Sequence, residues 1–258
     1  MPSLLIGKQP VLEALNSDTP IEKIYLLHRM HSGLVEKIRS QAKRRGIPLV
    51  EISAERLREL TTDAHSQGVA ALVSAKSYVE PEDLLEAART NGEQPLLLIL
   101  DEIEDPQNLG ALIRSAECAG VHGVIIPKHH SASMNETVAK TSAGATAHMP
   151  IARVTNIAQT LDDLKTNGVW IVGADMAGEK AYYDADYRGP TAIVVGNEGK
   201  GIRRLVKEKC DFLVKIPMYG KIESLNVSVS GALLMFEAAR ARHQERGITA
   251  GGNNRKLI

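Results

Sequence analysis

Three short segments of the sequence combine glycine or proline turns with polar side chains that could bind a ligand or move a proton. They span residues 105–114, 194–201 and 216–230. The last two segments follow apolar runs, as turns at the ends of strands do. Glycine in such turns lets the backbone approach a ligand closely, because no side chain intervenes. We therefore expect a ligand pocket built largely from backbone groups.

The glycine-rich turn at 196–201 differs from the known phosphate-binding loops. Its glycines stand at the first, fourth and sixth positions, which is not the GxGxxG pattern, and no Lys-Ser or Lys-Thr pair ends it. The carboxylate of Glu198 would also repel a phosphate group. A cationic or hydroxyl-bearing ligand suits this turn better than a nucleotide phosphate does.

Four polar residues near these turns each fit a structural role as well as a functional one. Asn108 would begin a helix expected over 109–119 and could simply cap it. Arg114 follows six residues later, beside the apolar face of that helix, where a surface position is also usual. Ser224 and Asn226 would open a last long helix and could likewise be caps. Taken one by one, these residues do not identify a reaction.

Alternating apolar and amphipathic runs predict the framework that positions these residues. We expect a small α/β unit at 1–75, a linker at 76–95, a larger α/β unit at 96–246 and a flexible tail at 247–258. Strands are expected at 24–27, 48–52, 69–73, 96–100, 123–127, 169–173, 191–195 and 212–216. Helices are expected at 34–42, 54–60, 81–89, 109–119, 135–143, 157–166, 201–208 and 227–245. In the larger unit this alternation predicts a mainly parallel sheet with helices on both sides.

Length and composition are those of an ordinary protein with a hydrophobic core. The chain has 258 residues, of which 43% are apolar and 24% are charged, so two domains are expected. No apolar run is long enough to span a membrane, and residues 1–8 lack the apolar centre of a signal peptide, which favours the cytoplasm. Cys118 and Cys210 lack CxxC spacing and are expected to be buried reduced thiols. The histidines show no zinc-ligand spacing, so no metal is expected.

Basic residues gather in two stretches of a chain whose formal net charge is zero. Residues 29–45 hold six basic side chains and one acidic one, and residues 200–209 hold five and one. Such patches suit a polyanion that binds over a defined surface. Two solvated helix faces would have the same composition.

In this order and at this spacing, the three segments resemble the motifs of the SpoU, or TrmH, class of SPOUT RNA ribose 2'-O-methyltransferases. The resemblance covers residues 96–243. Residues 6–15 and 65–70 look like the family's substrate-binding domain, which is similar to ribosomal protein L30e, with Ser66 inserted into the usual His-Gln-Gly-Val. The two-domain arrangement is most similar to the subgroup that methylates a guanosine ribose in the P-site loop of 23S ribosomal RNA.

The resemblance implies that the larger unit is a SPOUT domain with a deep trefoil knot and that it binds S-adenosylmethionine. The implied cofactor contacts are Val195, Gly196, Gly201, Ile216, Met218 and Leu225. The implied catalytic residues are Asn108, Arg114, Glu198, Ser224 and Asn226. Within this set, Glu198 and Asn226 would orient Arg114 and the substrate. A homodimer is implied as well, packed through C-terminal helices. The apolar face formed by Ala232, Leu233, Phe236 and Ala239 offers such a surface, and the same residues could equally belong to the core.

The resemblance leaves the substrate open. A tRNA ribose methyltransferase, an enzyme acting on another 23S site as antibiotic-resistance methyltransferases do, and a non-catalytic RNA-binding protein of the same fold are the alternatives. Because aromatic residues make up 3% of the chain, phosphate contacts rather than base stacking should dominate RNA binding. The affinity for RNA should therefore weaken steeply with salt.

Arg114 falls where the family places its proposed general base. A guanidinium keeps its proton well above neutral pH, so this role is chemically awkward. A nearby sulfonium and a dry pocket would disfavour the charge of Arg114, whereas Glu198 would favour it. The alternative is a charged Arg114 that holds the RNA phosphate next to the target ribose.

Overall fold

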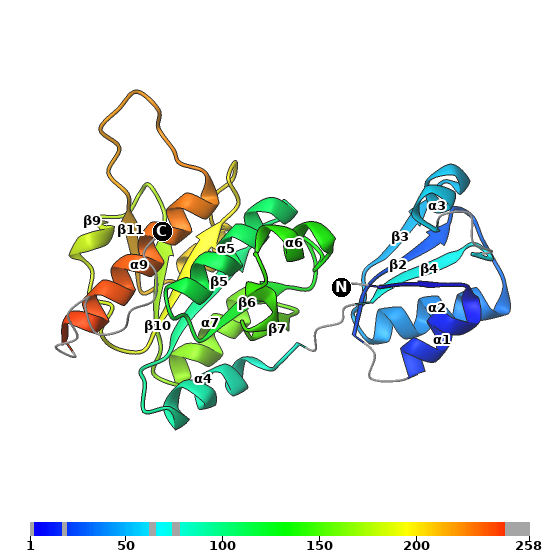
Figure 1. Ribbon diagram of the computed structural model, residues 1–258, viewed down its shortest axis with the longest axis horizontal. Helices are drawn as coiled ribbons and strands as arrows, with labels where there is room; N and C mark the ends of the chain where they lie inside the picture. The colour runs from blue at the N-terminus through cyan, green and yellow to red at the C-terminus, as the bar shows by residue number, and fades with distance from the viewer. Residues whose placement is uncertain (1–2, 17–19, 62–65, 74–77, 246–258) are drawn as a thin grey trace.

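The computed structural model describes residues 3–16, 20–61, 66–73 and 78–245. Within these residues the chain forms two units, each with its own sheet and its own packed helices (Figure 1). Residues 247–258, where we expect a flexible tail, lie outside the described part of the chain.

The first sheet has four strands in the order β1-β4-β2-β3. The strands are β1 (Ser3–Ile6), β2 (Ile21–Leu27), β3 (Leu49–Ile52) and β4 (Val69–Val73), and the helices are α1 (Lys8–Asn16), α2 (Gly33–Arg44) and α3 (Ala54–Thr61). β4 runs antiparallel to both of its neighbours, while β2 and β3 are parallel. α1 and α2 pack on one face of this sheet, where Val11, Ile24 and Val35 are fully buried.

β1 and α1 lie where the sequence pattern predicts neither a strand nor a helix. β1 has four residues, and α1 carries Pro10 in its first turn, so neither shows a long periodic pattern. β1 becomes a strand because it pairs with β4, from Ser3 opposite Val73 to Ile6 opposite Ala70. Long-range pairing therefore decides an element that the local sequence leaves open.

The second sheet has seven strands in the order β7-β6-β5-β10-β8-β11-β9, and all neighbouring strands are parallel. The strands are β5 (Leu96–Asp101), β6 (Gly123–Pro127), β7 (Ile151–Val154), β8 (Trp170–Ala174), β9 (Lys180–Ala181), β10 (Thr191–Gly196) and β11 (Phe212–Lys215). Every residue of β5 and β10 is buried. The expected parallel α/β architecture is confirmed, with β7 and β9 as additional strands, and the knot stays a prediction.

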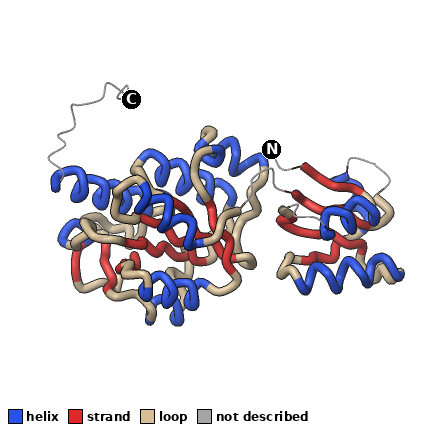
Figure 2. The backbone as a smooth tube through the Cα atoms, turned by 90° about the horizontal axis from the view of Figure 1, so that it is seen from below, coloured by secondary structure: helices blue, strands red, loops and turns tan. Residues whose placement is uncertain are grey.

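Helices cover both faces of this sheet (Figure 2). α5 (Pro106–Cys118), α6 (Glu136–Thr141) and α9 (Val227–Glu245) pack on one face, and α4 (Pro81–Thr90), α7 (Ile157–Thr166) and α8 (Arg204–Glu208) pack on the other. Successive side chains of a strand point to opposite faces. Leu98 and Leu100 accordingly join the first core, while Leu97 and Ile99 join the second.

The segment 76–95, which the composition predicts to be a linker, contains α4. Leu84 and Leu85 of this helix are buried against the second sheet. Leu84 packs so closely that a Cβ atom on Gly123 would lie 2.4 Å from it. We therefore propose that α4 belongs to the second unit and that the boundary between the units lies before Pro81.

α5 begins three residues earlier than expected, because Asp105 caps it. The Asp105 carboxylate accepts hydrogen bonds from the backbone N–H groups of Gln107 (3.2 Å) and Asn108 (3.3 Å). Pro106 suits the first helical position, where its missing N–H costs nothing. Asn108 is therefore inside the helix rather than its cap, and its side chain makes other contacts.

The prediction of two buried cysteines is wrong for Cys118, which is exposed at the end of α5, while Cys210 is half-buried. Both are free thiols. Burial raises the pKa of Cys210 to about 12, so this residue stays a neutral thiol at physiological pH. The described residues contain no group of His, Cys, Asp and Glu that could hold a metal ion, and none of their helices is long and apolar enough to cross a membrane.

Candidate active site

A cavity of about 320 Å³ opens at the carboxyl ends of β8, β10 and β11. Parallel strands end at one edge of a sheet, and ligands of open α/β sheets bind beyond that edge. All six residues expected around a cofactor line this cavity: Val195, Gly196, Gly201, Ile216, Met218 and Leu225. Glu198 and Ser224 line it too. Two segments that are apart in the sequence therefore form one cavity.

The loop at 196–201 is closed by its own backbone. Asn197 N donates to Gly201 O at 3.1 Å, and Gly201 N donates to Asn197 O at 2.8 Å. Gly201 has a φ of 67°, which glycine adopts without strain. The Asn197 side chain donates to Glu102 O at 3.1 Å and accepts from Gly199 N at 2.9 Å. The loop is thereby tied to the residues that follow β5.

Gly196 lies where two parts of this loop pass close together. A Cβ atom at this position would be 2.2 Å from the carbonyl carbon of Gly201 and 2.3 Å from Ile202 N. These are backbone atoms, so they cannot rotate away as a side chain could. Packing within the protein thus requires glycine here, in addition to any close approach of a ligand.

Asp101, the last residue of β5, anchors the chain that leaves the loop. Its carboxylate is fully buried and accepts hydrogen bonds from Arg203 N and Arg203 Nε, both at 2.8 Å. The hydrogen bond to Asp101 raises the pKa of the Arg203 guanidinium. A buried carboxylate is costly unless it is paired, so this contact holds the residues after Gly201 against β5.

Glu198 lies at the centre of a hydrogen-bonded cluster with Asn108 and Asn226, called here the Glu198 cluster. Its Oε1 atom accepts from Asn108 Nδ2 at 2.9 Å and from Asn226 Nδ2 at 2.6 Å. Asn226 Nδ2 also lies 3.0 Å from Asn108 Oδ1. Val227 N, at the start of α9, lies 3.4 Å from the same carboxylate oxygen, where the helix dipole favours negative charge. One carboxylate thus connects α5, the 196–201 loop and α9.

Arg114 and Ser224 are exposed and do not belong to this cluster. Arg114 lies on α5, outside the cavity wall, and it forms no hydrogen bond or ion pair with another described residue. Glu198 and Asn226 were expected to orient Arg114, but their side chains bind Asn108 and each other instead. Arg114 is therefore available to a molecule outside this chain.

The basic stretch 200–209 is largely neutralised by carboxylates, contrary to the local charge count. Its ion pairs are Arg203 with Asp101, Arg204 with Glu208, Lys207 with Asp175 and Lys209 with Asp162. Three of these carboxylates come from distant parts of the chain. The stretch 29–45 keeps more free charge, because Lys37, Lys43 and Arg44 are exposed on α2 and pair with no described carboxylate.

Asp175 and Met176 also line the cavity, and the sequence motifs do not include them. They directly follow β8, which pairs with β10. Their position after a strand could have predicted this, because residues just beyond the carboxyl ends of neighbouring parallel strands meet at the ligand-binding edge of the sheet. Lys207 Nζ fixes the Asp175 carboxylate at 2.5 Å.

The cavity wall suits S-adenosylmethionine. Apolar side chains such as Ile216 and Leu225 can cover an adenine ring. Glu198 lines the cavity and its negative charge favours a ligand that carries a positive sulfonium, whereas the charge of Asp175 is balanced by Lys207. The glycine-rich loop presents backbone groups without bulky side chains.

Two family models match this chain. The SpoU rRNA Methylase family model matches residues 95–236, which is more than half of the chain. The model for RNA 2'-O ribose methyltransferase substrate binding matches residues 4–79. The first match spans the larger sheet and its cavity, and the second spans the smaller sheet.

Known proteins are similar over most of the chain. The putative TrmH family tRNA/rRNA methyltransferase YacO of Bacillus subtilis (strain 168) is 46% identical, over 93% of this chain and 96% of its own. The crystal structure of the SpoU methyltransferase AviRb from Streptomyces viridochromogenes in complex with AdoMet has a TM-score of 0.59 and 25% identity, over 93% of this chain and 90% of its own. The A. aeolicus TrmH/SpoU tRNA modifying enzyme has a TM-score of 0.55 and 30% identity, over 65% of this chain and 86% of its own.

Proposed function

Because the chain belongs to the SpoU family of RNA methylases, we infer that it transfers a methyl group from S-adenosylmethionine to a ribose 2'-hydroxyl of RNA. The observation that carries this inference is the convergence of six expected cofactor contacts on one cavity beside the Glu198 cluster. The reaction is a displacement at a methyl carbon. The protein therefore has to position two reactants and help to remove one proton.

When bound, S-adenosylmethionine supplies a methyl group that is already activated by its sulfonium. The 196–201 loop and the residues after β11 would hold it with backbone groups and apolar side chains. We assign the Glu198 cluster to the place where the ribose meets the cavity, because its three side chains hold one another in fixed positions. Fixed groups need little rearrangement when the substrate arrives. Ser224, exposed on the cavity wall, would contact the same region.

We assign Arg114 to the RNA, as a charged group that holds the phosphate next to the target ribose. Its exposure and its lack of a carboxylate partner among the described residues support this role. A planar guanidinium can bind a phosphate through two parallel hydrogen bonds. To act as a general base, Arg114 would first have to release its own proton, which arginine keeps near neutral pH.

We propose that the substrate is 23S ribosomal RNA and that the target is a guanosine in its P-site loop. The substrate-binding domain matched at residues 4–79 supports a large RNA. The A. aeolicus tRNA modifying enzyme aligns with 65% of this chain, so about a third of the chain has no counterpart in that alignment. We take this difference as support for a substrate other than tRNA. Action on ribosomal RNA would place the protein in the cytoplasm.

Incubation with radiolabelled S-adenosylmethionine and either unmodified 23S rRNA or tRNA tests this proposal. We expect one 2'-O-methyl group in the P-site loop, mapped by its resistance to alkaline cleavage. The control is 23S rRNA that already carries the modification and should accept no label. Label in tRNA or at another 23S site would overturn the target and keep the reaction, whereas no label in any RNA would favour a non-catalytic RNA-binding protein.

We also propose a homodimer that packs through α9. Leu234, Met235 and Ala238 of this helix are buried in the core, whereas Phe236 is 50% exposed and Val229 is 46% exposed. Exposed apolar side chains that gather on one helix face mark a surface for a partner. A second copy of the chain would present the same face, as a two-fold interface requires.

The Phe236→Asp variant is expected to be a monomer, because a charge in the centre of an apolar interface is strongly unfavourable. Light scattering after size-exclusion chromatography measures the mass. Since Phe236 is half-exposed in the single chain, the fold should persist, and circular dichroism checks this. The matched control is Trp170→Asp, which changes an exposed aromatic residue at the start of β8. A dimeric Phe236→Asp variant, or a monomeric wild type, would contradict the proposal.

A further inference from the structure

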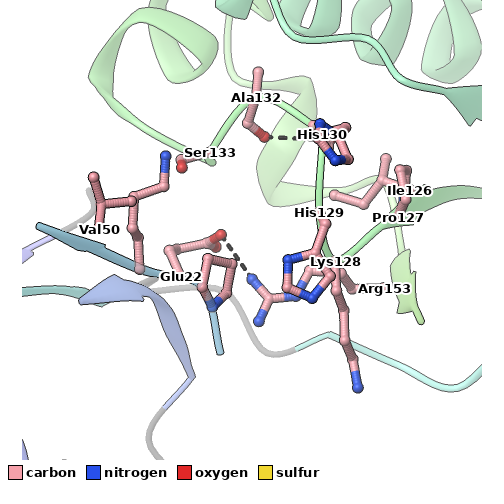
Figure 3. A pocket seen from close by; sticks show the side chains of 13 residues that line it. Glu22, Val50, Ile126, Pro127, Lys128, His129, His130, Ala132, Ser133 and Arg153 are labelled. Carbon is pink, nitrogen blue, oxygen red and sulfur yellow. Dashed lines mark hydrogen bonds and ion pairs between the residues drawn. The ribbon is translucent and has the colours of Figure 1, made fainter. Parts of the chain in front are cut away.

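A second cavity, of about 200 Å³, lies between the two units and is called here the inter-unit cleft. One wall consists of Glu22, Lys23, Pro48 and Val50, and the other consists of residues 126–133 and Arg153. Figure 3 shows the side chains of the two walls around the cleft. Small-molecule pockets usually enclose about 300 Å³ or more. The inter-unit cleft is therefore better suited to part of a long ligand than to a second cofactor.

A buried ion pair joins the two walls. Arg153 Nη1 donates to Glu22 Oε2 at 3.0 Å (Figure 3). Arg153 Nη2 donates to Ile21 O at 3.2 Å. The side chains of Arg153 and Glu22 are 12% and 3% exposed. The Tyr78 hydroxyl also donates to Glu22, and the Arg153 guanidinium lies 4.6 Å from the centre of the Tyr78 ring. Breaking a buried ion pair is costly, so this contact keeps the walls facing each other.

The ion pair leaves the inter-unit cleft with an excess of positive charge. Glu22 is the single acidic residue among the described residues that line it, and Arg153 already pairs with it. Lys23 and Lys128 also line the cleft, are half-buried, and form no ion pair with another described residue. Lys128 reaches the first unit, because a Cβ atom on Gly46 would lie 3.9 Å from Lys128 Nζ. Two ammonium groups on one small cavity repel each other, and an anion between them removes this repulsion.

The inter-unit cleft and the cofactor cavity open on the same edge of the seven-stranded sheet. Residues 128–133 follow β6, which pairs with β5, and the loop after β5 leads to Asn108. The two loops are joined, because Ala132 N donates to Ile103 O at 2.8 Å. A strand of RNA that lies in the cleft can therefore continue along this edge to the Glu198 cluster.

We propose that the inter-unit cleft binds the phosphodiester backbone of the substrate RNA, with Lys23 and Lys128 as its phosphate contacts. This inference rests on the proposed function, because it takes RNA as the substrate. The two lysines come from different units, so the site exists only when the Glu22–Arg153 pair aligns them. Contacts to phosphate set the position of the RNA without reading its sequence.

Replacement of each lysine by glutamine tests this proposal. Lys23→Gln and Lys128→Gln are each expected to raise the Kd for 23S rRNA about tenfold, because each removes a charged hydrogen bond to phosphate. The slope of log Kd against log salt should fall by about 0.7–0.9 for each lysine removed. The Kd for S-adenosylmethionine should not change. The matched control is Lys180→Gln. Lys180 is exposed on β9, which is the outermost strand on one side of the sheet, whereas β7 is the outermost strand on the other side.

A photo-crosslinking residue in place of Val50, which is 37% exposed, provides a second measurement that needs no loss of binding. It should crosslink to the RNA, whereas the same residue in place of Trp170, at the amino end of β8, should not. Lysine variants that bind RNA as Lys180→Gln does, or crosslinking that is equal at the two positions, would overturn the inference. The titration requires no methyl transfer. RNA binding that depends on the cleft without any transfer would thus overturn the proposed function alone, and transfer with binding independent of the cleft would overturn this inference alone.

Discussion

The Gly196→Ala variant is expected to lose both folding stability and the binding of S-adenosylmethionine. The added Cβ atom would lie 2.2 Å and 2.3 Å from backbone atoms of Gly201 and Ile202, and backbone cannot move aside without opening the loop. Overpacking of this kind costs about 3 kcal/mol. In a protein of this length, a loss of that size lowers the Tm by roughly 6–12 °C. Differential scanning calorimetry measures the Tm, and isothermal titration measures the affinity for the cofactor.

Two other glycines of the same loop provide a graded control. A Cβ atom on Gly199 would meet nothing closer than Asn197 Oδ1 at 3.6 Å, so Gly199→Ala should leave the Tm nearly unchanged. A Cβ atom on Gly201 would make only an ordinary contact, 3.8 Å from Asp175 Oδ2, but its φ is 67°, so Gly201→Ala should cost about 1–2 kcal/mol from backbone strain. The expected order of destabilisation is Gly199, then Gly201, then Gly196. Equal effects at Gly196 and Gly199 would show that the close backbone contact is not what the loop requires.

The Arg114→Ala variant is expected to lower kcat/KM for RNA about 100-fold, because the ribose is no longer held next to the cofactor. Arg114→Lys keeps the charge and loses the bidentate geometry. For this variant we expect a KM for RNA about tenfold higher and a kcat within about threefold of the wild type. Single-turnover methyl transfer at saturating S-adenosylmethionine, with RNA titrated, separates the two parameters.

Arg204→Ala is the matched control for Arg114. Arg204 is exposed on α8, on the opposite face of the sheet from α5, and pairs only with Glu208 among the described residues. Surface pairs of this kind contribute little, so the control should keep wild-type kinetics. If Arg114→Lys loses kcat as fully as Arg114→Ala does, the phosphate-binding role is wrong and the general-base role is favoured.

The buried parts of the larger unit follow closely from local sequence pattern. The apolar runs 96–100 and 191–195 become β5 and β10, whose residues are buried on both faces of the sheet. α7 and α9 have the expected bounds. A long run with many apolar residues indicates a helix clearly, because a helix can bury these apolar side chains against the sheet. The pattern fails at the start of α5, where Asp105 and Pro106 set an earlier boundary, and at α8, which begins at Arg204 rather than at 201.

The charges of the protein could not be assigned from the sequence in the same way. Residues 200–209 form a basic stretch by local count, yet Asp101, Asp162 and Asp175 neutralise three of its side chains. The inter-unit cleft is instead positive, because it brings together Lys23 and Lys128, which are far apart in the sequence. Coulomb energy depends on distance in space, and spacing along the chain sets that distance only within one element.

The sequence by itself determined the class of fold, the family and the motif residues that line the larger cavity, although not Asp175 and Met176. Those properties depend on local runs of residues and on short motifs. Only the tertiary structure decided what these residues do to one another: Glu198 binds Asn108 and Asn226 rather than Arg114, and Gly196 is required by the backbone of its own loop. Hydrogen bonds and close contacts are effective over a few ångströms. The atoms that satisfy them come from α5, the 196–201 loop and α9, which meet only when the chain has folded.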